Sequence, residues 1–342
     1  MNTLLPLCSS IVSLLFAALV FDQWRQRRQS FQLVWMIGLI FYGVSAGTEV
    51  WGSAFGWSGP LYRAWYLIGA IFVAAYLGMG TVYLLARTAF GYFAGVTVLL
   101  GGVLSLAFTR VYPGSGPVGR IAFAVAMLGG LAIILATSRW RAWAPHIALA
   151  VLLAGSLGAA YLVLGAPLAA PGWALDPSTQ VPVGTAFPGY VRVLTAPFNI
   201  AGALCLVFGA AFSAYVYMPK RKLLPVDAVR TPVLAQGWYF VVVAVNFLGS
   251  LPLAFRALLA GRLNSRVPAT MLIALGGFVP SLTSGLNRFG ITWTFYLGEL
   301  LGVLLILTGF LVSEEVFSNV RLPARGVVWH RLRRTDEGEP AG

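Results

Sequence analysis

The amino-acid sequence predicts an all-α, polytopic transmembrane helix bundle. Apolar residues make up 59% of the 342-residue chain and charged residues only 10%, far below the roughly 25% charged residues of a soluble domain. A soluble fold of this composition would expose large apolar patches to water. We therefore expect lipid around most of the chain, and helices satisfy their own backbone hydrogen bonds in lipid.

Ten runs approach the roughly 20 apolar residues that a membrane span needs. They are 4–21, 31–52, 61–86, 90–109, 121–138, 145–166, 191–218, 232–255, 267–286 and 291–313. Most connections between these runs are short, so neighbouring helices run antiparallel and no connection can fold as a separate domain. The sequence therefore predicts a single transmembrane domain at 1–317 and a cytoplasmic tail at 318–342.

The distribution of Lys and Arg tests whether all ten runs cross, because these residues favour the cytoplasmic side. With ten crossings and an outside start, 11 basic residues lie inside and 12 outside, which is no bias. If 232–255 does not cross, 18 basic residues lie inside and 5 outside. If 267–286 is re-entrant, 15 lie inside and 8 outside. Charge favours the first alternative, whereas the Gly, Pro, Ser and Thr residues at 276–285 favour the second.

Both alternatives predict about nine crossings plus one re-entrant or non-spanning segment, with the N-terminus outside and the C-terminus in the cytoplasm. The 21 Arg against 2 Lys are typical of GC-rich bacterial genomes, so we expect the bacterial inner membrane. The longest connection, 167–190, carries five prolines and lies outside in this threading. Because proline prevents helix and central strand, we expect a stiff, extended loop across the outer mouth, either a functional lid or a simple cover.

Two carboxylates fall where hydrocarbon is expected, and ionisable groups at that depth are candidates for function. Glu299 is about eight residues into the last run, roughly 12 Å below its start. Glu49 lies three residues from the outer end of the second run, and its spacing from Tyr42 and Ser45 puts all three on one helix face. The same side of the predicted membrane carries three arginines: Arg63, Arg192 and Arg288.

These residues support two interpretations. In the first, the seven residues line an outward-facing polar cavity, in which the arginines bind an anionic group and the carboxylates bind a cation or proton. In the second, Glu49 pairs with Arg63 and Glu299 pairs with Arg288, and these ion pairs only hold the bundle together. The sequence does not decide between a ligand site and a structural one.

The sequence lacks the residues that several classes of functional site require. The chain has only two histidines, and no His, Cys and carboxylate cluster has metal-ligand spacing, so we expect no metal site. We find no phosphate-binding Gly-rich loop and no Ser/His/Asp set, and we predict neither a cofactor nor a catalytic residue. The net charge of +13 is not arranged with stacking aromatics, so we do not expect nucleic acid as a partner.

The stretch WMIGLIFYGVSAGTEVWG, followed by LYRAWYLIGA, resembles the start of the seven-helix membrane sensor regions of bacterial histidine kinases. The matching residues are Trp35, Glu49, Trp65 and Tyr66. The resemblance implies a membrane-embedded, ligand-sensing region. The chain departs from that pattern because its apolar runs continue well past seven and no kinase domain follows.

We therefore expect an integral membrane protein with a ligand site in its bundle, either a transporter or a sensor-like module. The lipid bilayer is the expected partner, together with a small-molecule or lipid ligand. One alternative is an assembly subunit of a larger membrane complex, since Gly-rich helix faces suit packing against other membrane proteins. Another is an enzyme that acts on lipid-embedded substrates, with Glu299 as acid or base.

Overall fold

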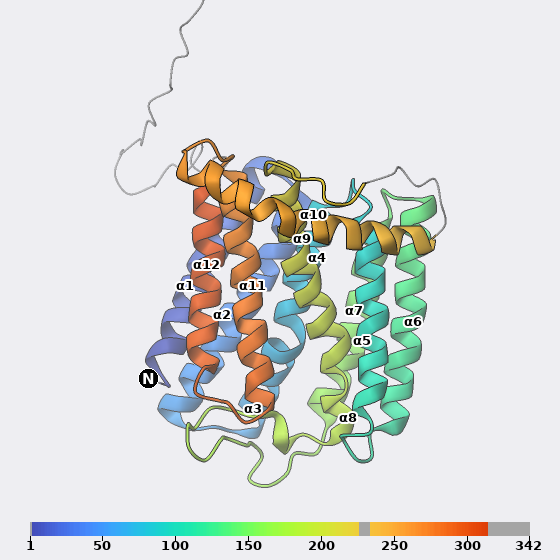
Figure 1. The fold of residues 1–342 in the computed structure, drawn as a ribbon. Coiled ribbons are helices and arrows are strands. Elements are labelled where there is room, and N and C mark those ends of the chain that lie inside the picture. The colour runs from blue at the N-terminus through green and yellow to red at the C-terminus, as the bar shows by residue number, and fades with distance from the viewer. Residues whose placement is uncertain (1, 226–232, 314–342) are drawn as a thin grey trace, which may run out of the picture.

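The structure, a computed structural model, describes residues 2–225 and 233–313. Within these ranges ten helices are long and apolar enough to cross a membrane. Nine of them run along a common axis, whereas α10 lies across one end of the bundle (Figure 1). The predicted all-α polytopic bundle is therefore confirmed, while the predicted tail at 318–342 lies outside the described residues.

The elements follow one another as α1 Leu4–Arg27, α2 Ser30–Phe55, α3 Gly59–Trp65, the π-helical η1 Tyr66–Phe72, α4 Val73–Leu84, α5 Phe90–Phe108, α6 Gly116–Arg139, α7 Ala144–Gly165, the 3₁₀ turn η2 Gly184–Ala186, α8 Gly189–Arg192, the π-helical η3 Ala196–Ile200, α9 Ala201–Tyr217, α10 Val233–Leu259, α11 Arg266–Arg288 and α12 Phe295–Val312. Turn chemistry sets the helix ends. Gly56, with φ +96°, stops α2, and the Ser58 hydroxyl caps α3 by accepting a hydrogen bond from the Leu61 amide.

The two ends of the bundle differ in charge. One end, which we call the loop end, carries the connections 56–58, 109–115, 166–188 and 289–294; the other, which we call the α10 end, carries α10 and the remaining connections (Figure 1). Five described basic residues belong to the loop end: Arg63, Arg110, Arg120, Arg192 and Arg288. The other twelve described Lys and Arg residues belong to the α10 end.

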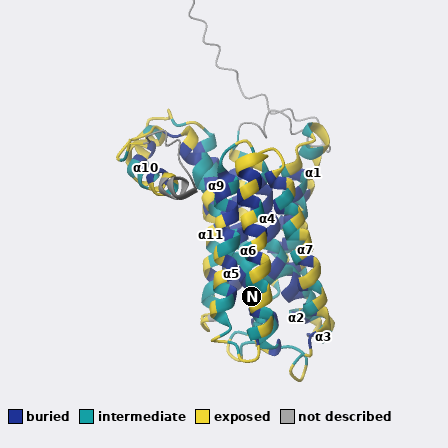
Figure 2. Cartoon of the chain, turned by 90° about the vertical axis from the view of Figure 1, so that its right-hand side faces the viewer, coloured by how far each residue is buried: buried dark blue, intermediate teal, exposed yellow. Residues whose placement is uncertain are grey.

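The non-spanning segment is the 232–255 run, as the charge count favoured. Figure 2 shows that α10 projects beyond one side of the bundle at this end. Asn246 is fully buried there. Its side-chain oxygen accepts hydrogen bonds from the Leu223 and Leu224 amides at 2.7 and 2.9 Å, and Ser250 Oγ accepts one from the Arg221 amide at 2.8 Å. These bonds fix the basic segment 220–222 against α10.

The alternative that 267–286 is re-entrant is wrong, because α11 is one continuous helix within the bundle. Its small residues serve close packing and do not break the helix. The Pro280 ring lies over Gly302 of α12, and a Cβ on Gly276 would meet the Gly302 carbonyl at 2.7 Å. Ser281 Oγ donates to the Gly277 carbonyl at 2.7 Å. The composition that suggested a broken backbone is therefore the composition of a tight α11–α12 contact.

Helices α4 and α9 make the closest crossing in the centre of the bundle. A Cβ on Gly78 would overlap the Gly202 backbone, and one on Gly202 would overlap the Ala74 carbonyl. On the loop-end side of this crossing, the segments that directly precede α4 and α9 are the π-helical η1 and η3. Buried residues gather along this axis, and exposed residues face outward (Figure 2). Long apolar side chains such as Leu128 and Leu157, which are 70% and 75% exposed, suit a lipid-facing surface.

Candidate functional site

A cavity of about 440 Å³ extends from the loop end into the bundle. Its volume lies within the roughly 300–1,000 Å³ of small-molecule sites. Its walls are supplied by helices α2, α3, α4, α8, α9, α11 and α12, by the π-helical η1 and η3, and by the connection 166–188. Four of the predicted site residues line it: Tyr42, Ser45, Arg192 and Glu299.

The two acids of the predicted site meet at the wall of this cavity. Glu299 lines the cavity, and its carboxyl group is hydrogen-bonded to that of Glu49, which is fully buried behind it. Glu49 Oε1 accepts a hydrogen bond from Trp65 Nε1 at 2.8 Å. The second oxygen of each carboxyl group is buried without a hydrogen-bond donor. The pair is therefore incompletely satisfied by the described residues that surround it.

The depth of the two acids differs from the sequence-based expectation. Because α12 begins at Phe295, Glu299 lies only four residues into it, about 6 Å from its start. Because α2 continues to Phe55, Glu49 lies six residues from its end, about 9 Å. The two carboxylates thus reach similar depths from the loop end, which allows them to touch.

The face of α2 that carries Glu49 points into the bundle, as the helical spacing predicts. Tyr42 and Ser45 are 6% and 4% exposed. The Tyr42 hydroxyl donates to the backbone carbonyl of Glu299 at 2.7 Å and so ties α2 to α12 beside the acid pair. Ser45 Oγ is packed against Gly69 of η1, and a Cβ at position 69 would require this hydroxyl group to move.

Among the described side chains, Arg63 does not form the ion pair with Glu49 that the structural interpretation required. Arg63 Nη2 donates to the Ala166 carbonyl at 2.5 Å, while its buried Nε has no partner, and Arg63 does not line the cavity. Arg192 lines the cavity from α8, with its guanidinium 4.2 Å from the centre of the Tyr112 ring. Arg288 ends α11, but its side chain lies outside the described parts of the chain.

Irregular backbone lines the cavity at membrane depth. Tyr66, Gly69 and Ala70 of η1 and Asn199 of η3 belong to its wall. Asn199 Nδ2 donates to the Ala70 carbonyl at 3.4 Å, so the two π-helical segments are linked to each other. Pi-helical turns are rare and frequently occur at functional sites. Such backbone is tolerated inside a membrane protein where it borders a cavity.

The proline-rich connection forms part of the cavity wall at the loop end. Val181, Ala186 and Phe187 are buried, and the Phe187 ring stacks on Tyr62 with ring centres 5.2 Å apart. The Tyr62 hydroxyl donates to the Val183 carbonyl. Asp176, which also lines the cavity, accepts four hydrogen bonds from Ser178 and Thr179. This connection is thus a packed part of the bundle end.

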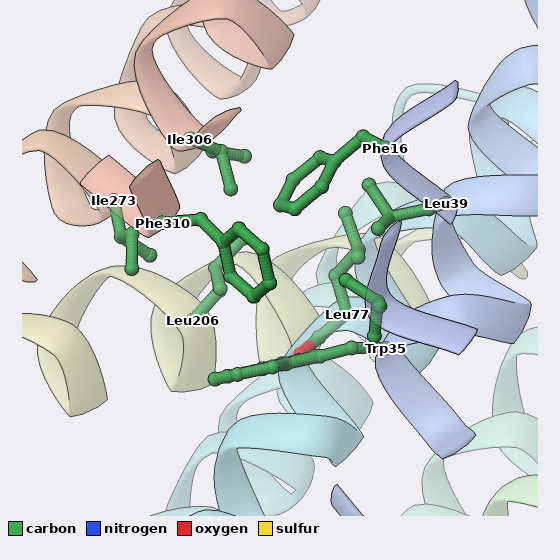
Figure 3. A pocket seen from close by; sticks show the side chains of 9 residues that line it. Phe16, Trp35, Leu39, Leu77, Leu206, Ile273, Ile306 and Phe310 are labelled. Carbon is green, nitrogen blue, oxygen red and sulfur yellow. The ribbon is translucent and has the colours of Figure 1, made fainter. Parts of the chain in front are cut away.

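The inner end of the cavity meets a closed apolar cluster, which Figure 3 shows. A pocket of only about 20 Å³ remains between its side chains. They are Phe16, Val20, Trp35, Leu39, Leu77, Leu206, Ile273, Ile306 and Phe310. Leu77, Leu206 and Ile306 line both the cavity and this pocket, so they form the shared wall between the two spaces.

Sequence reasoning missed several residues of the site. Trp65, the donor to Glu49, was indicated only through the resemblance, although a buried carboxylate needs a donor. The polar wall of α11, including Ser281 and Ser284, was interpreted as a broken helix. Across residues 2–225 and 233–313, no group of three His, Cys, Asp or Glu side chains is arranged to hold a metal ion.

Comparisons of the chain with protein-family models, curated proteins and solved structures gave no match. The geometry of the cavity therefore carries the functional argument.

Proposed function

We propose that this integral membrane protein binds a small polar ligand in the cavity of the loop end, and that it acts as a transporter. The observation that carries the proposal is the cavity itself, which reaches from the loop end to membrane depth and has an acid pair in its wall. Discontinuous helices that expose irregular backbone at a central site are typical of secondary transporters. The paired π-helical segments of this chain resemble that arrangement.

The proposed orientation puts the loop end outside and the α10 end in the cytoplasm of a bacterial inner membrane. The supporting observation is charge, since twelve of the described basic residues lie at the α10 end and short basic segments favour the cytoplasm. The N-terminus is then outside and the ligand reaches the cavity from outside. A cytoplasmic α10, with Leu248, Phe255 and Leu259 more than 60% exposed, lies in the lipid headgroup region.

A sensor-like module remains the second candidate, because the acid at the end of α2 and the aromatic pair Trp65 and Tyr66 resemble histidine-kinase sensor regions. The apolar cluster favours the transporter. It closes the cavity from the α10 end with side chains alone, and opening such a closure alternately to each side is how a transporter moves its ligand. A sensor needs the cavity but has no use for a second access route.

Cysteine labelling tests the cavity and the orientation together. In a Cys8→Ser, Cys205→Ser background, a membrane-impermeant thiol reagent should modify Ser178→Cys and Ser284→Cys in intact cells. It should not modify Asn264→Cys, at the α10 end, until the cells are permeabilised. Ile273→Cys, in the apolar cluster, should react from neither side in the absence of ligand. Reaction of Asn264→Cys but not Ser178→Cys in intact cells would reverse the orientation, and a protected Ser284→Cys would exclude an open cavity.

Ligand binding is tested by thermal stabilisation of the purified protein with a panel of small amines, amino acids, carboxylates and sugars. A compound at 100 times its dissociation constant stabilises the folded state by about 2.7 kcal/mol. Ser284→Trp, which fills the cavity, should abolish the effect. Leu128→Trp on the outer surface of α6, where the native side chain is 70% exposed, should leave it unchanged. Uptake of the stabilising compound into proteoliposomes identifies a transporter, and binding without uptake identifies the sensor-like module.

A further inference from the structure

The contact between Glu49 and Glu299 sets the charge of the empty site. Ionised carboxylates only accept hydrogen bonds, so a bond between two carboxyl groups needs a proton on one of them. Two ionised carboxylates in contact repel each other strongly where water is excluded. The hydrogen-bonded pair therefore holds one proton and carries one net negative charge when the cavity is empty.

Among the described side chains, the groups that face the pair leave this negative charge uncompensated. Tyr42 faces it from α2, Trp65 from α3 and Tyr296 from α12, and each of these side chains is neutral. Of the cations nearby, Arg63 is bound to the Ala166 carbonyl and Arg192 stacks on Tyr112. The free oxygens of the two carboxyl groups, Oε2 of each, are buried and lack a donor. A cation brought through the cavity would supply the positive charge that the pair lacks.

We propose that a small organic ammonium ion binds at the Glu49–Glu299 pair and displaces the shared proton. This inference rests on the proposed ligand cavity and names its substrate class. On binding, the proton leaves through the cavity to water and the cation takes its place between two ionised carboxylates. The net charge of the site is minus one before and after the exchange, so the buried site never gains charge.

The size and lining of the cavity favour an organic ammonium over a bare metal ion. About 440 Å³ is far more space than one ion fills. The aromatic side chains of Trp65, Tyr66 and Phe295 line the same space as Glu299. Aromatic faces next to a carboxylate are the usual recognition elements for ammonium groups, because the ring quadrupole attracts a desolvated cation.

The exchange is measured on the purified wild-type protein in lipid nanodiscs, with tetramethylammonium as the probe because it carries no exchangeable proton. Infrared spectroscopy should show the C=O stretch of a protonated carboxyl group, and saturating tetramethylammonium should remove it. A pH indicator in weakly buffered solution should report one proton released per protein. In acid, the apparent dissociation constant for tetramethylammonium should rise about tenfold for each unit by which the pH falls, since one proton competes with one cation.

Variants assign the proton to the pair. Glu49→Gln and Glu299→Gln should each abolish proton release near neutral pH. In Glu49→Gln the pH dependence of tetramethylammonium binding should move to lower pH, because a carboxyl group without a second carboxylate beside it loses its proton more readily. Asp22→Asn, which removes an exposed acid on α1 at the α10 end, is the matched control and should behave as the wild type. The infrared and proton-release measurements on the wild type decide the question even where a variant folds poorly.

Three outcomes would overturn the inference. The first is tetramethylammonium binding with the carboxyl band intact and no proton released. The second is proton displacement by sodium but not by tetramethylammonium, which would make the ligand an inorganic cation. The third is a neutral or anionic compound that stabilises the protein in a manner abolished by Ser284→Trp while leaving the carboxyl band unchanged. This third outcome would sustain the ligand cavity and reject only its assignment to cations.

Discussion

The halves of the bundle on either side of the α4–α9 crossing differ in how they treat polar groups. Toward the loop end, one π-helical turn follows α3 and another precedes α9, and a polar cavity reaches two buried acids. Toward the α10 end, the same helix bundle closes on aromatic and aliphatic side chains around a pocket of about 20 Å³ (Figure 3). Leu77, Leu206 and Ile306 belong to both spaces.

This difference indicates where a membrane protein can bury charged side chains. Buried acids are costly in a low dielectric, and the two buried acids of the described bundle lie where a cavity and the Trp65 donor are within reach. The apolar half needs neither, since its side chains fill the space at close-packed density. A protein of this construction is accessible from one end and sealed toward the other, so changes in the two halves should have different consequences.

The first prediction concerns the crossing that joins the two halves. Gly78→Ala places a Cβ on the Gly202 backbone, which cannot move aside as a flexible side chain would. We expect a loss of about 1–3 kcal/mol from overpacking, because α4 and α9 must separate. The measurement is the unfolding temperature of the purified protein in detergent.

Gly158→Ala is the control for this prediction. Gly158 lies inside α7 with nothing within 4 Å of an added Cβ, so the substitution should be neutral or gain up to about 1 kcal/mol from helix propensity. Equal unfolding temperatures for the two variants would show that the α4–α9 contact is not as close as the structure has it.

A second prediction compares one leucine from each half. Leu39 is 2% exposed in the apolar cluster, and Leu39→Ala should cost about 2–5 kcal/mol, since the space it leaves cannot be filled by water. Leu175 lines the open cavity from the proline-rich connection, where water replaces the lost atoms, so Leu175→Ala should cost less. The unfolding temperatures of the two variants, measured side by side, test this difference. A larger loss of stability for Leu175→Ala than for Leu39→Ala would contradict the contrast between a sealed half and an open one.

The sequence predicted the spans well because span length and apolar composition are local properties. It also placed Tyr42, Ser45 and Glu49 on one inward face, which depends only on helical periodicity. The contact between Glu49 and Glu299 could not be predicted in this way. It joins helices 250 residues apart in the chain, and it depends on where α2 ends and α12 begins, which differ from the apolar runs by a few residues.

Composition misled the prediction for α11 in a way that has a physical cause. Gly276, Gly277 and Pro280 are residues that break helices in water, but in lipid small residues also allow two helices to approach closely. The charge count gave the better answer for α10, because the positive residues around 220–222 and at Arg256, Arg262 and Arg266 all lie at one end. Asn246 illustrates the limit, since its partners are backbone amides that no pattern in the sequence identifies.

The smallest predicted effect concerns Asp176 at the mouth of the cavity. Its carboxylate accepts hydrogen bonds from the hydroxyl and amide groups of Ser178 and Thr179 at 2.6–3.0 Å. These bonds, the Ser178 hydroxyl first among them, lower the pKa of Asp176 to about 2. Because the ionised form is the one bound in the fold, its stabilisation is complete above the ordinary pKa of about 4 and is lost as the pH falls through about 2.

Asp176→Asn should therefore lower the unfolding temperature slightly near neutral pH, and the difference from the wild type should shrink between about pH 4 and pH 2. Asp176 is only half-buried, so the effect should be smaller than that of Gly78→Ala or Leu39→Ala. Asp22→Asn at the α10 end serves as the control and should show no such trend. A wild-type advantage that persists below about pH 2, where both forms are neutral, would mean that the turn at 176–179 depends on the shape of the side chain and not on its charge.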